Sequence, residues 1–224
     1  MSEPAAAGRG DEASLGARLR EEREHRGLSL RELARRLEVS PSLVSQIETG
    51  KTQPSVRTLY AIVSELGVSL DDIFNPSNGD LGGRSVLVER RRSARVPGEM
   101  PTSAESVGRV QRAADRRLID LGSGVRWERL TTWNDRDVDF LYAIYEAGGS
   151  SSPDGSLMRH NGREFGIVLA GSLGVTVGFE EYVLEAGDSI AFDSNIPHRL
   201  HNDGDEVVTA IWMVLGRHHH PSEH

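Results

Sequence analysis

The 224-residue sequence predicts a two-domain protein, with an all-α N-terminal part followed by an all-β C-terminal part. Three observations support this fold class. Apolar residues recur at helical spacing over residues 14–74, beginning with Leu15 and Leu19. The turn-forming segment Asn75–Ser85 interrupts this pattern. Beyond it, short runs of β-branched and aromatic residues are separated by Gly, Pro and Asn-Asp, which is typical of strands.

The helical part is expected to contain five short helices. Ser29 and Glu32 form a capping-box sequence, in which each side chain satisfies a backbone N–H of the other residue. Gly27, Gly50 and Gly67 lie where helices should end, because glycine adopts the left-handed conformation of a helix C-terminus. The expected helices span residues 14–26, 29–37, 41–49, 55–66 and 69–74.

The second part is expected to be a closed antiparallel barrel or jelly roll, because many short strands follow one another without helices between them. Residues 112–120 alternate in charge and favour a solvated pair of strands. The main strand-forming runs are residues 126–132, 138–146, 164–179, 182–192, 198–202 and 206–215.

These patterns divide the chain into five segments. A leader of Ala, Gly, Pro and charged residues shows no periodicity, which predicts disorder. The predicted segments are a disordered leader at 1–13, a helical domain at 14–74, a linker with an edge strand at 75–106, a barrel domain at 107–215 and a flexible tail at 216–224.

Composition excludes several classes of function. The net charge of -8 argues against a wholesale nucleic-acid coat. The chain has no cysteine, which excludes disulfides, thiol catalysis and zinc-thiolate sites. No stretch approaches the roughly 18 apolar residues that span a bilayer, and the N-terminus lacks the pattern of a signal peptide. We therefore expect a cytoplasmic protein without membrane contact.

The stretch "SLRELARRLEVSPSLVSQIETGKTQPS" (residues 29–55) predicts a DNA-reading module. Ala34 permits two helices to cross closely, and Ser40-Pro41 is a favourable N-cap and first-turn pair for the second helix. Hydroxyls and an amide on its exposed face suit contact with base edges, and glutamine can pair with adenine. Lys51 would meet phosphate, which positions a protein on the duplex. The predicted DNA contacts are Arg31, Ser40, Pro41, Ser42, Ser45, Gln46, Lys51 and Thr52.

Residues 14–74 resemble the helix-turn-helix domains of the phage lambda and 434 repressors, also called the xenobiotic-response-element type. The resemblance implies that Ser42 and Gln46 are the principal base contacts. It also implies that Arg23 and Glu48 form an ion pair between the first and third helices. Glu38 departs from the pattern, because that turn often has Gly in a left-handed conformation. A module used only for protein contacts is the alternative.

Residues 107–215 resemble the cupin family. The first cupin motif falls on Gly149, His160, Glu164 and Gly171, and the second on Gly187, His198 and Asn202. The first histidine of the usual pair is absent, because Met158 stands two positions before His160. The resemblance therefore implies a reduced ligand set, with two imidazoles and one carboxylate facing the barrel interior.

His160, Glu164 and His198 can bind Fe, Mn, Ni or Zn as divalent ions and leave positions open for another ligand. Three interpretations remain open. The metal belongs to an effector site, or it supports chemistry on a small molecule, or the three side chains bind a polar effector without metal. Arg126 and Met158 are further candidates for contacting an effector.

The two resemblances together predict a transcriptional regulator and not an enzyme. It would bind a double-stranded DNA operator as a homodimer paired through the barrels, and a small-molecule effector would control it. Blocking polymerase is the simplest mechanism and favours a repressor. The alternative is a non-haem metal-dependent enzyme, because hydroxypropylphosphonate epoxidase also joins a helix-turn-helix domain to a cupin. Such an enzyme should use its helical domain to cover the barrel mouth and to contact substrate.

Overall fold

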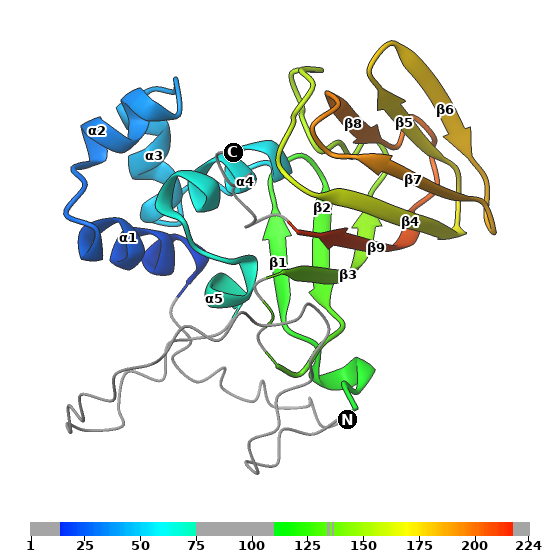
Figure 1. Cartoon of the computed structure of the whole chain (residues 1–224), viewed down its shortest axis with the longest axis horizontal. Helices are drawn as coiled ribbons and strands as arrows, with labels where there is room; N and C mark the ends of the chain where they lie inside the picture. Colours follow the sequence, from blue (N-terminus) through cyan, green and yellow to red (C-terminus); the bar gives the residue numbers. More distant parts are fainter. Residues whose placement is uncertain (1–13, 75–109, 134, 136, 217–224) are drawn as a thin grey trace, which may run out of the picture.

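The structure is a computed structural model that describes residues 14–74, 110–133, 135 and 137–216 (Figure 1). The predicted leader, the predicted linker with its edge strand, and all but the first residue of the predicted tail lie outside the described residues. Among the described residues, no helix combines the length and the apolar character needed to cross a bilayer.

Five helices form the N-terminal part, and each lies within one residue of the bounds expected from the sequence. A serine side chain caps each of the first four helices by accepting a backbone N–H three residues later, as Ser14 does from Ala17. Gly67 ends the fourth helix at φ 61°. The helices are α1 (Leu15–His25), α2 (Leu30–Arg36), α3 (Pro41–Glu48), α4 (Val56–Leu66) and α5 (Leu70–Phe74).

The predicted capping box at α2 forms only in one direction. The Ser29 hydroxyl accepts the backbone N–H of Glu32 at 3.1 Å. The Glu32 carboxylate instead accepts hydrogen bonds from Arg35 and Arg36 at 2.7 and 2.9 Å. These two guanidinium groups, with the hydrogen bond from Arg35 first, lower the pKa of Glu32 to about 2. The reciprocal bond is lost because cations one turn along the helix compete for the carboxylate.

A buried ion pair holds α1 against α3, as the resemblance implied. Arg23 donates from Nε and Nη2 to the two Glu48 carboxylate oxygens at 2.6 and 2.9 Å. Arg23 also donates to the Leu28 carbonyl at 2.7 Å. The approach of the two helices is close enough that a Cβ on Gly16 would lie 2.0 Å from the Ile47 carbonyl oxygen. The bidentate geometry offsets the desolvation of both charges.

The described residues of the C-terminal part form nine strands, and every strand pair among them is antiparallel. A six-stranded sheet has the order β1-β2-β3-β9-β4-β7, and a three-stranded sheet has the order β6-β5-β8. The two sheets form the jelly-roll barrel seen in Figure 1. The strands are β1 (Leu118–Leu121), β2 (Val125–Arg129), β3 (Val138–Tyr145), β4 (Arg163–Ala170), β5 (Leu173–Val177), β6 (Glu180–Leu184), β7 (Ser189–Asp193), β8 (His198–His201) and β9 (Val208–Leu215).

The structure corrects the sequence analysis at three places in this part. Residues 112–120 are not a pair of strands, because a 3-10 turn at Ala113–Asp115 precedes the single strand β1. The run 164–179 forms two strands separated at Gly171, which has φ 77°. The run 182–192 likewise divides into two strands around Gly187, which has φ 97°. These positive φ angles reverse the chain where only glycine does so at low cost.

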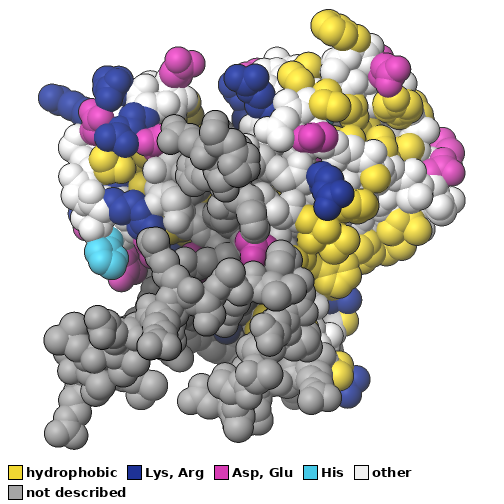
Figure 2. Space-filling view, viewed as in Figure 1, with side chains coloured by type: hydrophobic (Ala, Val, Ile, Leu, Met, Phe, Trp, Pro, Cys, Tyr) yellow, Lys and Arg dark blue, Asp and Glu magenta, His cyan; other side chains and the backbone are white. Residues whose placement is uncertain are grey.

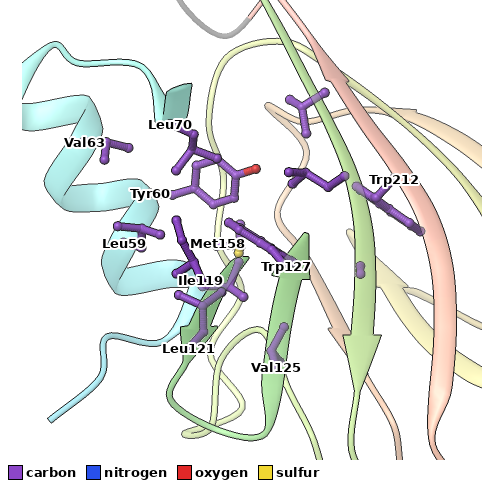
Figure 3. Packing of buried hydrophobic residues seen from close by; sticks show 14 of the residues in the cluster. Leu59, Tyr60, Val63, Leu70, Ile119, Leu121, Val125, Trp127, Met158 and Trp212 are labelled. Atoms are coloured by element: carbon purple, nitrogen blue, oxygen red, sulfur yellow. The ribbon is translucent and has the colours of Figure 1, made fainter. Parts of the chain in front are cut away.

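The helical part packs directly against the barrel through α4. Figure 3 shows Leu59 and Tyr60 of α4 pointing toward Ile119 and Trp127 of β1 and β2. All four side chains are buried, with at most 6% of their surface exposed. The two parts therefore share one continuous hydrophobic core.

Breaking the Arg23–Glu48 pair should destabilise the helical domain strongly. Glu48→Ala leaves the buried Arg23 guanidinium without its bidentate carboxylate partner, which costs about 3–5 kcal/mol of unfolding free energy. Urea denaturation followed by circular dichroism measures this loss. Arg20→Ala, which breaks the exposed Arg20–Glu24 pair and leaves Arg23 untouched, is the control and should cost less than about 1 kcal/mol. Similar losses in both variants would show that the buried pair contributes no more than a surface one.

Candidate functional site

Helix α3 presents a polar surface on its outward side. Pro41, Ser42 and Gln46 are exposed, whereas Val44 and Ile47 are buried against the other helices. The Gln46 amide lies 3.5 Å from the Ser42 hydroxyl. The helix therefore offers an amide and a hydroxyl side by side, one helical turn apart, without an apolar side chain between them.

The other predicted DNA contacts lie on or next to this helix. The Ser40 hydroxyl is committed to the helix cap, because it accepts the Leu43 N–H at 3.1 Å. Lys51 is exposed directly after α3, and its backbone N–H donates to the Gln46 carbonyl at 2.8 Å. Three further predicted contacts are at least partly exposed, namely Arg31, Ser45 and Thr52.

The second site is a cluster of two histidines and one glutamate inside the barrel. Glu164 comes from β4, His198 from β8, and His160 from the segment before β4. Each histidine Nε2 lies 3.0 Å from the same carboxylate oxygen, Glu164 Oε1. All three side chains are at most 4% exposed. The sequence motif thus predicted three residues that the fold brings together, with their ligand atoms within 4.8 Å of one another.

Each member of this cluster is oriented by a contact on its side away from the centre of the cluster. His160 Nδ1 lies 3.0 Å from the Asn161 carbonyl, and His198 Nδ1 lies 2.9 Å from the Ile196 carbonyl. Because a carbonyl only accepts, both Nδ1 atoms carry a proton, and both Nε2 atoms, which hold a lone pair when the imidazole is neutral, face the centre. Trp212 Nε1 donates to Glu164 Oε2 at 2.6 Å, which leaves Oε1 for the centre. Such outer contacts are characteristic of metal ligands.

The three inward atoms fit a divalent cation. Among the described residues, His160 Nε2, His198 Nε2 and Glu164 Oε1 have no hydrogen-bond partner in suitable geometry, although they are fully buried. When the imidazoles are neutral, these three atoms are all hydrogen-bond acceptors. They therefore face one another with no hydrogen-bond donor among them. Two nitrogens and one carboxylate oxygen suit Fe(II), Mn(II), Ni(II) or Zn(II). The residues present are therefore compatible with a bound metal.

The electrostatics of the cluster also favour positive charge. Burial raises the pKa of the Glu164 carboxyl, but His160 and His198 outweigh this effect and hold the pKa well below its usual range. Burial lowers the pKa of His198, but Glu164 more than compensates and raises it above its usual value. The buried carboxylate therefore stays ionised and attracts a proton or a metal ion to the neighbouring imidazoles.

The structure separates the two predicted effector contacts from each other. Arg126 is exposed on β2 and pairs with Asp120 at 2.6 Å, so it lies outside the cluster. Met158 is buried, and its backbone N–H donates to the His198 carbonyl at 2.9 Å. Figure 3 places the Met158 side chain beside Tyr60 and Trp127, where it contributes to the core between the two domains.

Two residues of the site were missed by the sequence analysis. Trp212 is one of them, because its buried indole donates a hydrogen bond to Glu164 and so fixes the carboxylate. Gly166 could have indicated this role, because a Cβ there would lie 2.0 Å from the Trp212 ring. Tyr60 of α4 stacks on His160 with ring centroids 4.6 Å apart and planes 22° apart. No local signal could identify Tyr60, because it reaches the cluster from another domain.

A cavity of about 650 Å³ adjoins the cluster at the boundary between the domains. The helical part and the barrel each supply one wall, and His160 lines the cavity from the barrel side. Its size lies within the usual range of small-molecule sites, about 300–1,000 Å³. The other lining residues are Glu38, Arg57, Tyr60, Ala61, Ser64, Gly67, Leu157, Met158, Arg159 and Asn161.

Comparison with protein families identifies both domains. Residues 19–73 match the helix-turn-helix family, and residues 141–214 match the cupin domain family. The chain therefore carries a helix-turn-helix domain followed by a cupin domain.

Known transcriptional regulators are similar to this chain along most of their length. The HTH-type transcriptional regulator PuuR of Escherichia coli is 29% identical over 198 residues, which cover 88% of this chain and 91% of PuuR. The HTH-type regulator SutR of Escherichia coli is 24% identical over 87% of this chain and 90% of SutR. A crystal structure of an HTH_3 family transcriptional regulator from Vibrio cholerae has a TM-score of 0.58 at 20% identity, covering 91% of this chain and 96% of that one. That likeness supports the fold.

Removing the indole donor should weaken metal binding. Trp212→Phe retains the ring but loses the hydrogen bond to Glu164, and loss of such an outer contact lowers metal affinity roughly 10–100-fold. Titration with Co²⁺, followed by visible absorption, measures the change. The control is Trp133→Phe, because at Trp133 the backbone carbonyl and not the indole bonds Arg129. Equal affinities in wild type and Trp212→Phe would refute the role of the indole.

Proposed function

We propose that this chain is a sequence-specific transcriptional repressor whose barrel binds a small-molecule effector together with a divalent metal. One observation carries this proposal: an exposed polar helix and a buried cluster of convergent ligand atoms occur in one chain, joined by a packed domain boundary. The first can read an operator and the second can sense a ligand. A cytoplasmic location, expected from the sequence, stays a prediction.

In this proposal α3 enters the major groove of the operator. Gln46 pairs with adenine and Ser42 contacts a neighbouring base. Pro41 and Ser45 approach the groove on either side of these residues. Arg31, Ser40, Lys51 and Thr52 face the phosphates and supply the salt-dependent part of the affinity, the Ser40 hydroxyl remaining in its cap.

His160, Glu164 and His198 would hold the metal, which we assign to Fe, Mn, Ni or Zn on the basis of the donor set. When bound, the metal offers open positions to an oxygen atom of the effector. The effector itself would occupy the cavity beside His160, and Met158 would line its inner end. Arg57 and Arg159 outnumber Glu38 on the walls, so a small organic anion suits this cavity best.

We further propose that the barrels pair two chains into a homodimer. Every large hydrophobic side chain that is strongly exposed among the described residues lies in the β part, and Figure 2 shows such side chains over the barrel. Strand β6 lies at the edge of its sheet, and its first four residues are exposed on both faces. Phe179 and Val183 are the most exposed of these apolar residues. Exposed apolar side chains beside this unpaired strand favour association with a second copy.

A metal-dependent enzyme is the second candidate. The observation that favours it is that α4 covers the barrel and contributes Tyr60 next to the ligand cluster, as a substrate-enclosing domain would. Anaerobic loading with Fe(II), followed by oxygen-uptake measurements with small organic acids, distinguishes the candidates. Steady consumption of oxygen above that of His198→Ala would establish catalysis.

Gln46→Ala tests the reading helix. The variant should lose about 1–3 kcal/mol of discrimination between the preferred operator and one with its adenine replaced, because the bidentate pairing is gone. Fluorescence anisotropy on a duplex selected by the wild type from a random pool measures this difference. Binding to non-specific DNA should persist and fall with salt. Gln53→Ala, an exposed glutamine beyond the helix, should discriminate like wild type, and unchanged discrimination in Gln46→Ala would count against the assignment.

The double variant Phe179→Ser/Val183→Asp tests the proposed pairing surface. Placing a charge and a hydroxyl on the exposed edge should convert dimers into monomers at micromolar concentration, because the apolar contact is removed. Native mass spectrometry reports the oligomeric state. Leu118→Ser, which alters an exposed apolar residue of β1, should leave the dimer intact. A double variant that remains dimeric would place the interface elsewhere.

A further inference from the structure

Tyr60 belongs to the DNA-binding domain, yet it forms part of the wall around the barrel cluster. Its ring stacks on His160 and meets Trp127 edge-on at 5.4 Å between centroids. Tyr60 is buried, with 6% of its surface exposed. His160 is the one cluster member that does not lie in a strand. Its ring is therefore held by a local bond to Asn161 and by a side chain from another domain.

Hydrogen bonds fix the N-terminal end of α4, the helix that contains Tyr60, to the barrel. Gly122 donates to the Pro54 carbonyl at 2.8 Å, and the Arg57 N–H donates to the Ser151 carbonyl at 3.1 Å. The Arg57 guanidinium also donates to the Ser156 hydroxyl at 2.9 Å. Pro54 lies in the segment that connects α3 to α4. The segment between the DNA-reading helix α3 and helix α4 is therefore bonded directly to the barrel.

The cavity lies between these same two walls. Arg57 and Tyr60 come from α4, whereas Arg159 and His160 come from the barrel. Occupancy of the cavity or of the ligand cluster therefore acts on the contact between the domains. A ligand can shift this contact only if it binds the two arrangements with different affinity.

We propose that Tyr60 is a positioning residue of the sensing site, and that its stack on His160 couples metal and anion binding in the barrel to DNA binding by α3. The inference rests on the proposed function and adds the route of regulation. The DNA-binding domain completes the sensing site, so binding at either end changes the affinity at the other by the same factor.

Three full-length proteins test this coupling: wild type, Tyr60→Leu and Tyr60→Phe. Leucine retains apolar bulk at the boundary but removes the stack, whereas phenylalanine retains the ring. Two quantities are measured for each protein. One is the Co²⁺ affinity by absorption, and the other is the affinity for a wild-type-selected duplex with and without Co²⁺. Tyr142→Ala, which alters a tyrosine of β3 that faces Arg116, is the control.

In wild type we expect Co²⁺ to change the DNA affinity about 2- to 10-fold, the range that one aromatic contact can supply. Tyr60→Leu should weaken Co²⁺ binding and bring the ratio of DNA affinities close to one. Tyr60→Phe and the control should behave as wild type. Wild-type coupling in Tyr60→Leu, or no effect of Co²⁺ on DNA affinity in wild type, overturns the inference.

The proposed function can fail separately. If wild type selects no duplex, the assignment as a DNA-binding repressor fails, and the Co²⁺ affinities of the Tyr60 variants still decide whether this residue positions His160. Equal Co²⁺ affinity in all three proteins would then overturn the positioning role. A melting temperature for each variant excludes loss of fold as the cause, and Tyr60→Phe guards against a general effect of substitution at this position.

Discussion

Burial of the Glu164 carboxylate imposes the requirement that organises the barrel around it. Removing a carboxylate from water costs several kcal/mol unless positive charge and hydrogen bonds replace the lost hydration. Trp212 supplies one hydrogen bond, and the lack of a side chain at Gly166 makes room for its indole. The two histidines approach the same carboxylate through Nε2, and the contact of each Nδ1 with a backbone carbonyl fixes the ring in that orientation. The arrangement is complete only when a proton or a metal ion joins it.

The helical domain contains a second buried carboxylate, and the comparison explains why the two sites differ in role. Glu48 faces Arg23, whose guanidinium is always charged and forms two parallel hydrogen bonds. That pair needs nothing from solution, so it serves the fold. Glu164 faces imidazoles, whose charge depends on protonation or on a metal. The negative charge of this cluster is balanced by a proton or a metal ion taken from solution. The cluster can therefore respond to its surroundings, and this property suits a sensor.

Local patterns predicted the parts of the structure that depend on spacing along the chain. Helix caps, the left-handed Glu38 at φ 55° and the histidines of the barrel follow from motifs. The exposure of Arg126 could have been predicted from strand alternation. Its neighbours Val125 and Trp127 are buried, and successive side chains of a strand point to opposite faces, so Arg126 points outward. Tyr60 lies beyond such reasoning, because its partner His160 is one hundred positions away and the contact depends on how two domains pack.

Coverage of the barrel by the helical domain, taken from the sequence as the mark of an enzyme, does not conflict with DNA binding in this fold. Helix α4 faces the barrel while α3 keeps its polar side exposed, so one small domain performs both tasks through different helices. Covering the site then has a regulatory consequence. A stacked aromatic pair contributes about 0.5–1.5 kcal/mol, and a sensor needs only a coupling of this order to shift operator occupancy severalfold. Because Arg57 of α4 and Pro54 in the segment just before this helix are both bonded to the barrel, the energy of the stack can be transmitted without a large rearrangement of either domain.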